Sequence, residues 1–190
     1  MIISFGGNAG SGKSTFAKML AEKLGWQRYY VGGIRRQKAK ERGLTLSEYN
    51  ILGESDPSTD LEVDEYQREL GKTLDNFVIE GRTSFFLIPH SFKIFLDVDE
   101  NVAAKRLYEE CKKKNERNEG DLLKSVEEAL ALLRQRKQSD DLRYRKYYNV
   151  EAFNPANFDY VLDTTNLTPD QVFDQVYRAV KEKLANIDKS

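Results

Sequence analysis

The residues best suited to chemistry form a glycine-rich run near the start of the chain. Residues 7–14 read Gly-Asn-Ala-Gly-Ser-Gly-Lys-Ser, which is the spacing G-x-x-x-x-G-K-[ST] between an apolar and an amphipathic stretch. This pattern predicts a loop whose backbone N–H groups surround a phosphate. Lys13 can reach the β- and γ-phosphates of ATP, and the Ser14 hydroxyl can bind Mg²⁺. The candidate contact residues are Gly7, Asn8, Ala9, Gly10, Ser11, Gly12, Lys13, Ser14 and Thr15.

Two arginines form the next candidate group. Arg36 follows the second apolar stretch, and Arg82 follows the third in Glu80-Gly81-Arg82. Ligands gather at the carboxyl ends of parallel strands, and the guanidinium fork suits phosphate. Together these arginines predict an acceptor that is itself a phosphate ester, although each alone could equally form a structural ion pair. Glu80 and Asp97, at two strand ends, could hold Mg²⁺ through water or simply cap the sheet.

A basic segment, residues 105–146, follows in the second half of the chain. Arg136, Asp140 and Arg143 have the i, i+4, i+7 spacing of one helical face, and Arg134 lies just before them. Phosphoryl transfer needs positive charge around the migrating group, and a closing lid that carries arginines supplies it while excluding water. We therefore expect a lid at about 115–150.

Alternating strand and helix patterns must position these residues. Apolar runs predict strands at 2–5, 28–31, 77–79, 92–98 and 158–162. Helical patterns cover 13–24, 34–42, 61–74, 99–114 and 122–138, with a loop at 115–121 and a last helix after Thr168. The alternation predicts an α/β fold of the P-loop NTPase kind, in which a five-stranded parallel sheet lies between two helical layers.

Composition limits the classes of function. The 190 residues are 39% hydrophobic, which suffices for one domain with its own core over 1–190. A net charge of −1 argues against a general polyanion binder, so we expect no nucleic-acid partner. One cysteine and one histidine exclude a disulfide scaffold and a Cys/His metal site. No apolar run approaches the roughly 20 residues of a membrane span, so we expect no membrane partner and a cytoplasmic location.

These motifs resemble those of the nucleoside monophosphate (NMP) kinases, most closely the short cytidylate kinases of the archaeal type. The resemblance covers nearly the whole chain and is carried by residues 7–14, 32–36, 39–44, 80–82, 134–144 and 163–168 and by the acidic stretch 60–64. It implies a helical NMP-binding region at about 32–75 beside the lid. It also implies that ATP phosphorylates a nucleoside monophosphate, CMP or dCMP, by direct in-line transfer.

The resemblance also implies roles around the donor nucleotide. Arg134 and Arg136 are expected to approach the transferring phosphoryl group, which makes them the candidate catalytic residues together with Lys13. Arg106, in the helical stretch before the lid, matches the position at which related kinases place an arginine against the donor adenine. We expect small-molecule partners only and a monomer.

Roles around the acceptor follow from the same resemblance. Arg36, Arg82 and Arg143 are implied to hold the monophosphate, and Asp140 is implied to orient the acceptor together with Arg136. The candidate acceptor-binding residues are Arg36, Gly81, Arg82, Arg136, Asp140 and Arg143.

Several alternatives stay open on the sequence. The run 30–33 and Thr83 depart from the family pattern near the acceptor base, so the sequence does not fix cytosine as the base of the acceptor. The acceptor could be AMP or UMP, or a metabolite such as shikimate or gluconate, but a phosphate-free acceptor would leave Arg36 and Arg82 without a shared purpose. From another class, the chain could bind ATP without turnover. Nucleic-acid binding through the basic segment ranks lowest because of the net charge.

Overall fold

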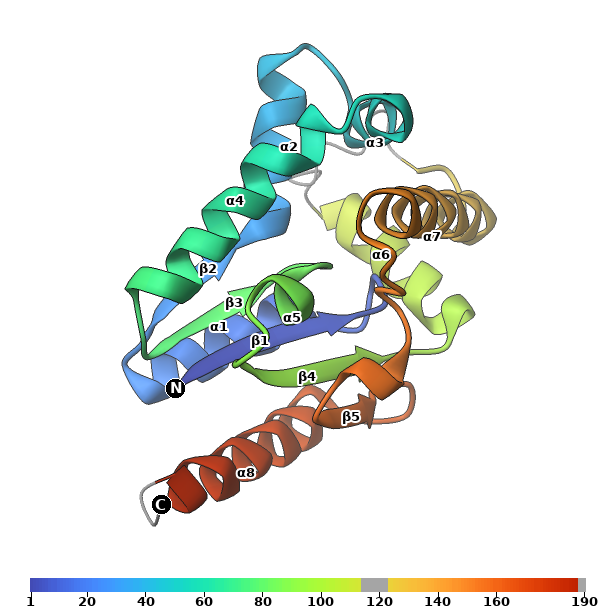
Figure 1. Ribbon diagram of the computed structural model, residues 1–190. Helices are drawn as coiled ribbons and strands as arrows, with labels where there is room; N and C mark the ends of the chain where they lie inside the picture. Colours follow the sequence, from blue (N-terminus) through green and yellow to red (C-terminus); the bar gives the residue numbers. More distant parts are fainter. Residues whose placement is uncertain (114–122, 188–190) are drawn as a thin grey trace.

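One parallel sheet organises the computed structural model, which describes residues 1–113 and 123–187 (Figure 1). Within them, five strands lie in the order β2-β3-β1-β4-β5, and all neighbouring strands run parallel. The strands are β1 (Ile2–Gly7), β2 (Gln27–Tyr30), β3 (Phe77–Glu80), β4 (Phe92–Asp97) and β5 (Tyr160–Asp163). The central β1 is buried along its whole length, and the expected five-stranded sheet is confirmed.

Helices cover both faces of this sheet (Figure 1). Their bounds are α1 (Lys13–Leu24), α2 (Val31–Glu41), α3 (Leu46–Ser55), α4 (Ser58–Thr73), α5 (Ser84–Leu87), α6 (Glu100–Lys113), α7 (Val126–Tyr148) and α8 (Pro169–Ile187). Side chains alternate along β1, so that Ile3 and Phe5 pack with α1 and α8. Ile2 faces the opposite way and packs with α4. The expected three-layer α/β/α arrangement is therefore confirmed.

The start of α2 differs from the prediction. The sequence predicts a strand at 28–31 and a helix from residue 34, which would leave Gly32 and Gly33 between the two elements. The strand instead ends at Tyr30, and both glycines lie in the first turn of α2. A Cβ atom built on Gly33 would lie 2.7 Å from the Tyr30 ring, and one on Gly32 would lie 3.0 Å from it. The glycines thus make room for an aromatic ring rather than for a turn.

The length of α7 also differs from the prediction. The expected helix ended near residue 138, but α7 runs unbroken for 23 residues to Tyr148. It is capped by Asn149, which adopts a left-handed conformation with φ of 53°. Its second half is held by buried polar side chains at Arg136, Asp140 and Arg143, which pack against other elements. The expected loop at 115–121 lies outside the described residues. Of the segment expected to form a lid, the structure describes residues 123–150, most of which belong to α7.

Helix-capping signals account for two further boundaries. The predicted cap of α8 is confirmed, because Thr168 accepts from the Gln171 backbone N–H while the Gln171 side chain accepts from the Thr168 N–H. Helix α3 was not predicted, yet Thr45 and Glu48 form the same type of capping box at its start. No helix in the described ranges combines the length and the apolar character needed to cross a membrane.

Candidate active site

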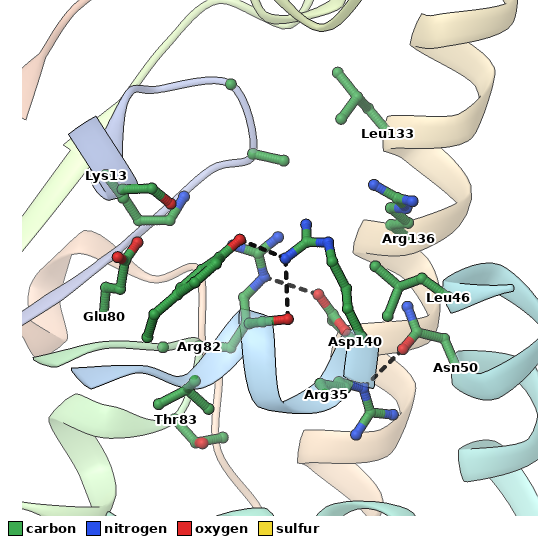
Figure 2. Close-up of a pocket in the computed structure, with 18 of the residues that line it drawn as sticks. Lys13, Arg35, Leu46, Asn50, Glu80, Arg82, Thr83, Leu133, Arg136 and Asp140 are labelled. Atoms are coloured by element: carbon green, nitrogen blue, oxygen red, sulfur yellow. Dashed lines mark hydrogen bonds and ion pairs between the residues drawn. The ribbon is translucent and has the colours of Figure 1, made fainter. Parts of the chain in front are cut away.

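A cavity of about 310 Å³ lies at the carboxyl ends of β1, β2 and β3 (Figure 2). Lys13 and Glu80 lie on one side of it. Asn50 of α3 and Arg136 and Asp140 of α7 lie on the other side. The cavity therefore brings the predicted triphosphate loop and the predicted acceptor residues to one place, as expected for an open parallel sheet.

The loop at residues 7–14, called the phosphate loop below, has the backbone its glycines predict. Gly7, Gly10 and Gly12 all have positive φ, at 119°, 80° and 91°. A Cβ on Gly7 would lie 2.1 Å from the Leu96 carbonyl oxygen, so the backbone of the neighbouring strand β4 leaves no room for a side chain there. The Lys13 ammonium folds across the loop and donates to the Asn8 carbonyl oxygen. Within residues 7–15, the cavity is lined by Ala9, Gly10, Gly12, Lys13, Ser14 and Thr15.

Two acidic residues support this end of the site. Asp97, at the end of β4, accepts from the Asn8 side chain and from the Val98 N–H, so its carboxylate anchors the phosphate loop. Glu80, at the end of β3, is 3% exposed and pairs with Arg28, whose Nε donates to Oε1 at 2.8 Å. Glu80 also lines the cavity, whereas Asp97 does not.

Arg82 connects the phosphate loop to α7. Its Nε donates to Oδ2 of Asp140 at 2.8 Å, and its Nη1 donates to the Gly7 carbonyl oxygen at 3.0 Å. Its guanidinium also lies 5.2 Å from the centre of the Phe153 ring. Arg82 is thus fixed between the loop and the helix with part of its surface facing the cavity.

Behind Arg82, charges of alternating sign continue into the protein. Arg143 of α7 donates to both carboxylate oxygens of Asp60, at 2.6 and 2.7 Å, and also to Asp140. Arg35 of α2 donates to the same Asp60 at 2.6 Å. The chain Arg35–Asp60–Arg143–Asp140–Arg82, called the buried charge chain below, therefore joins α2, α4 and α7 to the loop after β3.

The buried charge chain keeps Asp140 ionised. Burial by itself would raise the pKa of this carboxyl, but Arg143 and Arg82 outweigh that effect and hold its pKa below the ordinary value. A charged carboxylate that lines the cavity can accept hydrogen bonds from a ligand and can orient the arginines around it.

Most predicted residues reach the cavity. Arg36, Gly81, Arg82, Arg136 and Asp140 line it at the acceptor end. Arg106 lines it from α6, where its guanidinium donates to the carbonyl oxygens of Gly10 and Thr164 at 3.2 and 2.8 Å.

Five predicted residues do not line the cavity. Three belong to the phosphate loop, namely Gly7, Asn8 and Ser11. The other two are arginines of α7. Arg143 is completely buried behind Asp140 and is absent from the lining of the cavity, so its guanidinium holds carboxylates instead of facing a ligand. Arg134 is exposed on α7 and pairs with Glu100. It lines a second cavity beside Asn8 and Lys137, on another side of the phosphate loop.

The lining residues that were not predicted include three polar ones, Arg35, Asn50 and Asp64. Arg35 adjoins the predicted Arg36, and Asn50 lies on the unpredicted α3. Asp64 accepts from the Thr83 hydroxyl at 3.1 Å and from the Gln67 amide at 3.0 Å. The available signal was the i, i+4 spacing of two acids on one helical face of α4, at positions 60 and 64.

Arg143→Met is expected to lower the free energy of unfolding by about 3–5 kcal/mol, because it leaves Asp60 and Asp140 as undercompensated buried charges. Denaturant titration measures this loss. Arg145→Met is the matched control, since Arg145 is exposed on the same helix and its pair with Glu151 should contribute at most about 1 kcal/mol. Equal losses in the two variants would contradict the structural role of Arg143.

Asp64→Asn is expected to raise the melting temperature at neutral pH. Burial raises the pKa of Asp64, so above that raised pKa the ionised carboxylate destabilises the folded protein. The amide keeps an oxygen for Thr83 and Gln67 without carrying charge. The melting temperature should rise by roughly 2–4 °C per kcal/mol of penalty removed.

The same burial effect predicts how the difference in melting temperature between Asp64→Asn and the wild type depends on pH. This difference should vanish as pH falls toward about 4, where the Asp64 carboxyl is also protonated in the unfolded chain. Glu65→Gln, an exposed neighbour on α4, should leave the melting temperature unchanged. A variant at position 64 that melts lower than the wild type at pH 7 would contradict the burial penalty.

Comparison with known proteins agrees with this geometry. The model of the cytidylate kinase-like family matches residues 2–166. The chain is 37% identical to the cytidylate kinase of Natronomonas pharaonis, over 98% of this chain and 90% of that protein. It is 36% identical to the cytidylate kinase of Pyrococcus furiosus, over 95% of this chain and 88% of that protein.

Solved structures resemble the fold at lower sequence identity. An uncharacterized protein from Eubacterium ventriosum matches with a TM-score of 0.69 and 17% identity, covering 95% of this chain and 98% of that one. Shikimate kinase from Bacteroides thetaiotaomicron matches with a TM-score of 0.63 and 17% identity, covering 97% and 98%. These structural similarities establish the α/β/α fold. The match over residues 2–166, together with two archaeal relatives above 30% identity, establishes that the chain belongs to the cytidylate kinase-like family.

Proposed function

We propose that this protein transfers the γ-phosphoryl group of ATP to CMP or dCMP. The observation that carries the proposal is the single cavity in which the phosphate loop faces Arg36, Arg82 and Arg136. A triphosphate site and a second arginine-rich phosphate site within one cavity suit a kinase whose acceptor is a phosphate ester. The names of the archaeal relatives favour cytidylate as that acceptor.

ATP binding is assigned to the phosphate loop. Its positive-φ glycines allow backbone N–H groups to converge on the phosphates, and the start of α1 adds further donors. The Lys13 ammonium would exchange the Asn8 carbonyl for the β- and γ-phosphates. Arg106 would lie against the adenine, since it lines the same end of the cavity.

The residues present suit Mg²⁺. Ser14 offers one hydroxyl to the cavity and Glu80 a carboxylate that can act through water. The described residues hold no cluster of three or more acidic, histidine or cysteine side chains, and Mg²⁺ in kinases takes few protein ligands beside phosphates and water. When bound, Mg²⁺ neutralises charge on the phosphate oxygens.

The acceptor monophosphate is assigned to Arg36, Gly81 and Arg82, with Asp140 orienting the nucleotide. The attacking oxygen already belongs to a phosphate, so no general base is needed, and the protein has to align the reactants and compensate charge. Arg136 is assigned to the transferring group. Arg134 pairs with Glu100, so it could contact the transferring group only after a movement of α7. We assign the acceptor region to α2–α4 and the lid to α7.

An ADP-release assay with ATP and Mg²⁺ tests the proposal. The acceptors are CMP, dCMP, UMP, AMP, GMP and dTMP, with shikimate and gluconate beside them. We expect CMP or dCMP to give the highest kcat/KM. A preference for another monophosphate would support phosphoryl transfer to a nucleoside monophosphate but would reject CMP and dCMP as the acceptors. Turnover of shikimate or gluconate alone, or ATP binding without any turnover, would reject the proposed function.

A further inference from the structure

Tyr30 holds one of the proposed phosphate-binding arginines. The Tyr30 hydroxyl accepts from Nη1 of Arg36 at 2.5 Å, and the same nitrogen donates to the Gly32 carbonyl oxygen at 3.0 Å. The Arg36 guanidinium carbon also lies 5.7 Å from the centre of the Tyr30 ring. A second arginine, Arg28 of β2, also lies near this ring, with its guanidinium carbon 5.1 Å from the same centre.

The local backbone is shaped for this arrangement. A Cβ on Gly33 would lie 2.7 Å from Cδ1 of Tyr30, and a Cβ on Gly32 would lie 3.1 Å from Nη1 of Arg36. Neither glycine has a positive φ, so the backbone itself does not demand glycine there. The limit is one of space: a Cβ at Gly33 would clash with the ring, and one at Gly32 would lie in tight contact with the ring and the guanidinium. Tyr30, the two glycines and Arg36 therefore form one packed unit at the edge of the cavity.

We propose that Tyr30 is a positioning residue that orients Arg36 toward the acceptor phosphate. This inference rests on the proposed function, because it assigns the phosphate of the acceptor to Arg36. An arginine side chain has several rotatable bonds, and ordering it on binding costs free energy. The phenol oxygen, the Gly32 carbonyl and the ring face fix the guanidinium before the ligand arrives, so that less of this cost falls on binding. Both side chains line the cavity where the monophosphate would lie.

Tyr30→Phe tests this role, because it removes the hydroxyl and keeps the ring. We expect the KM for CMP to rise about tenfold, the size of one hydrogen bond to a charged group. The KM for ATP should stay unchanged. The inhibition constant of cytidine, which lacks the phosphate, should also stay unchanged, since Tyr30 acts on the phosphate through Arg36. Tyr29→Phe is the matched control, because Tyr29 packs against Phe77 and Tyr66 outside the cavity.

Gly33→Ala is the second variant, and it adds a methyl group without removing any hydrogen-bonding group. Its methyl group would displace the Tyr30 ring, so the KM for CMP should rise here too, again with unchanged cytidine inhibition. A wild-type KM for CMP in both variants would overturn the inference. So would an equal weakening of cytidine and CMP, which would place Tyr30 at the nucleoside. Failure of the wild-type protein to phosphorylate CMP would instead reject the proposed function, and the inference with it.

Discussion

Lys13→Met is expected to lower kcat about a thousandfold, the loss typical of removing a principal charge-stabilising group from a transition state. Lys13 is the one ammonium that the phosphate-loop motif places at the transferring group, and the cavity contains it. In the structure it already spans the loop to the Asn8 carbonyl, so it is held within reach of the phosphates. Methionine keeps much of the side-chain length and removes the charge.

Lys18→Met is the control for that experiment, because Lys18 is exposed on the same helix and forms a weak pair with Glu22. We expect this variant to match the wild type in kcat and in melting temperature. Initial rates of CDP formation, together with a thermal melt of each variant, measure both effects. Full activity in Lys13→Met would contradict the assignment of the triphosphate to the phosphate loop.

Arg82→Ala is expected to raise the KM for the acceptor and to lower kcat, with little change in the KM for ATP. Arg82 is bonded both to Asp140 and to the Gly7 carbonyl, so it ties the acceptor side to the phosphate loop. Losing one charge-assisted hydrogen bond to the acceptor phosphate costs about 1.5–3 kcal/mol, so kcat/KM for CMP should fall at least about tenfold.

A matched control separates this effect from a general loss of positive charge. Arg178→Ala removes an exposed arginine from α8, on the other side of the sheet, and should leave both Michaelis constants unchanged. Steady-state kinetics with CMP and ATP varied separately distinguish the two variants. An unchanged KM for CMP in Arg82→Ala would reject its role in acceptor binding.

Short-range signals were sufficient to predict most of the fold. The phosphate loop requires glycines at fixed spacing because three positive-φ positions fall there, and that spacing is visible in the sequence. The cap of α8 at Thr168 is equally local. Arg82 and Asp140 were found because a strand end and a helical spacing each mark their position.

Contacts between distant residues account for what the sequence could not show. The pair Gly32-Gly33 is typical of a turn, and only the structure shows that both glycines lie against the Tyr30 ring. Arg143 shares a helical face with Asp140, and its spacing suggests a ligand-binding residue. Its guanidinium faces Asp60, 83 positions away, and only the packing of α4 against α7 reveals that pairing.

The most direct test of the central claim follows the phosphoryl group itself. The protein is mixed with CMP, Mg²⁺ and ATP that carries a radioactive γ-phosphate, and the products are separated by chromatography. Direct transfer predicts that the label appears in the β-phosphate of CDP in step with ADP formation. Label that remains in ATP, or that appears only as inorganic phosphate while CMP is recovered unchanged, would contradict the assignment of this cavity to cytidylate phosphorylation.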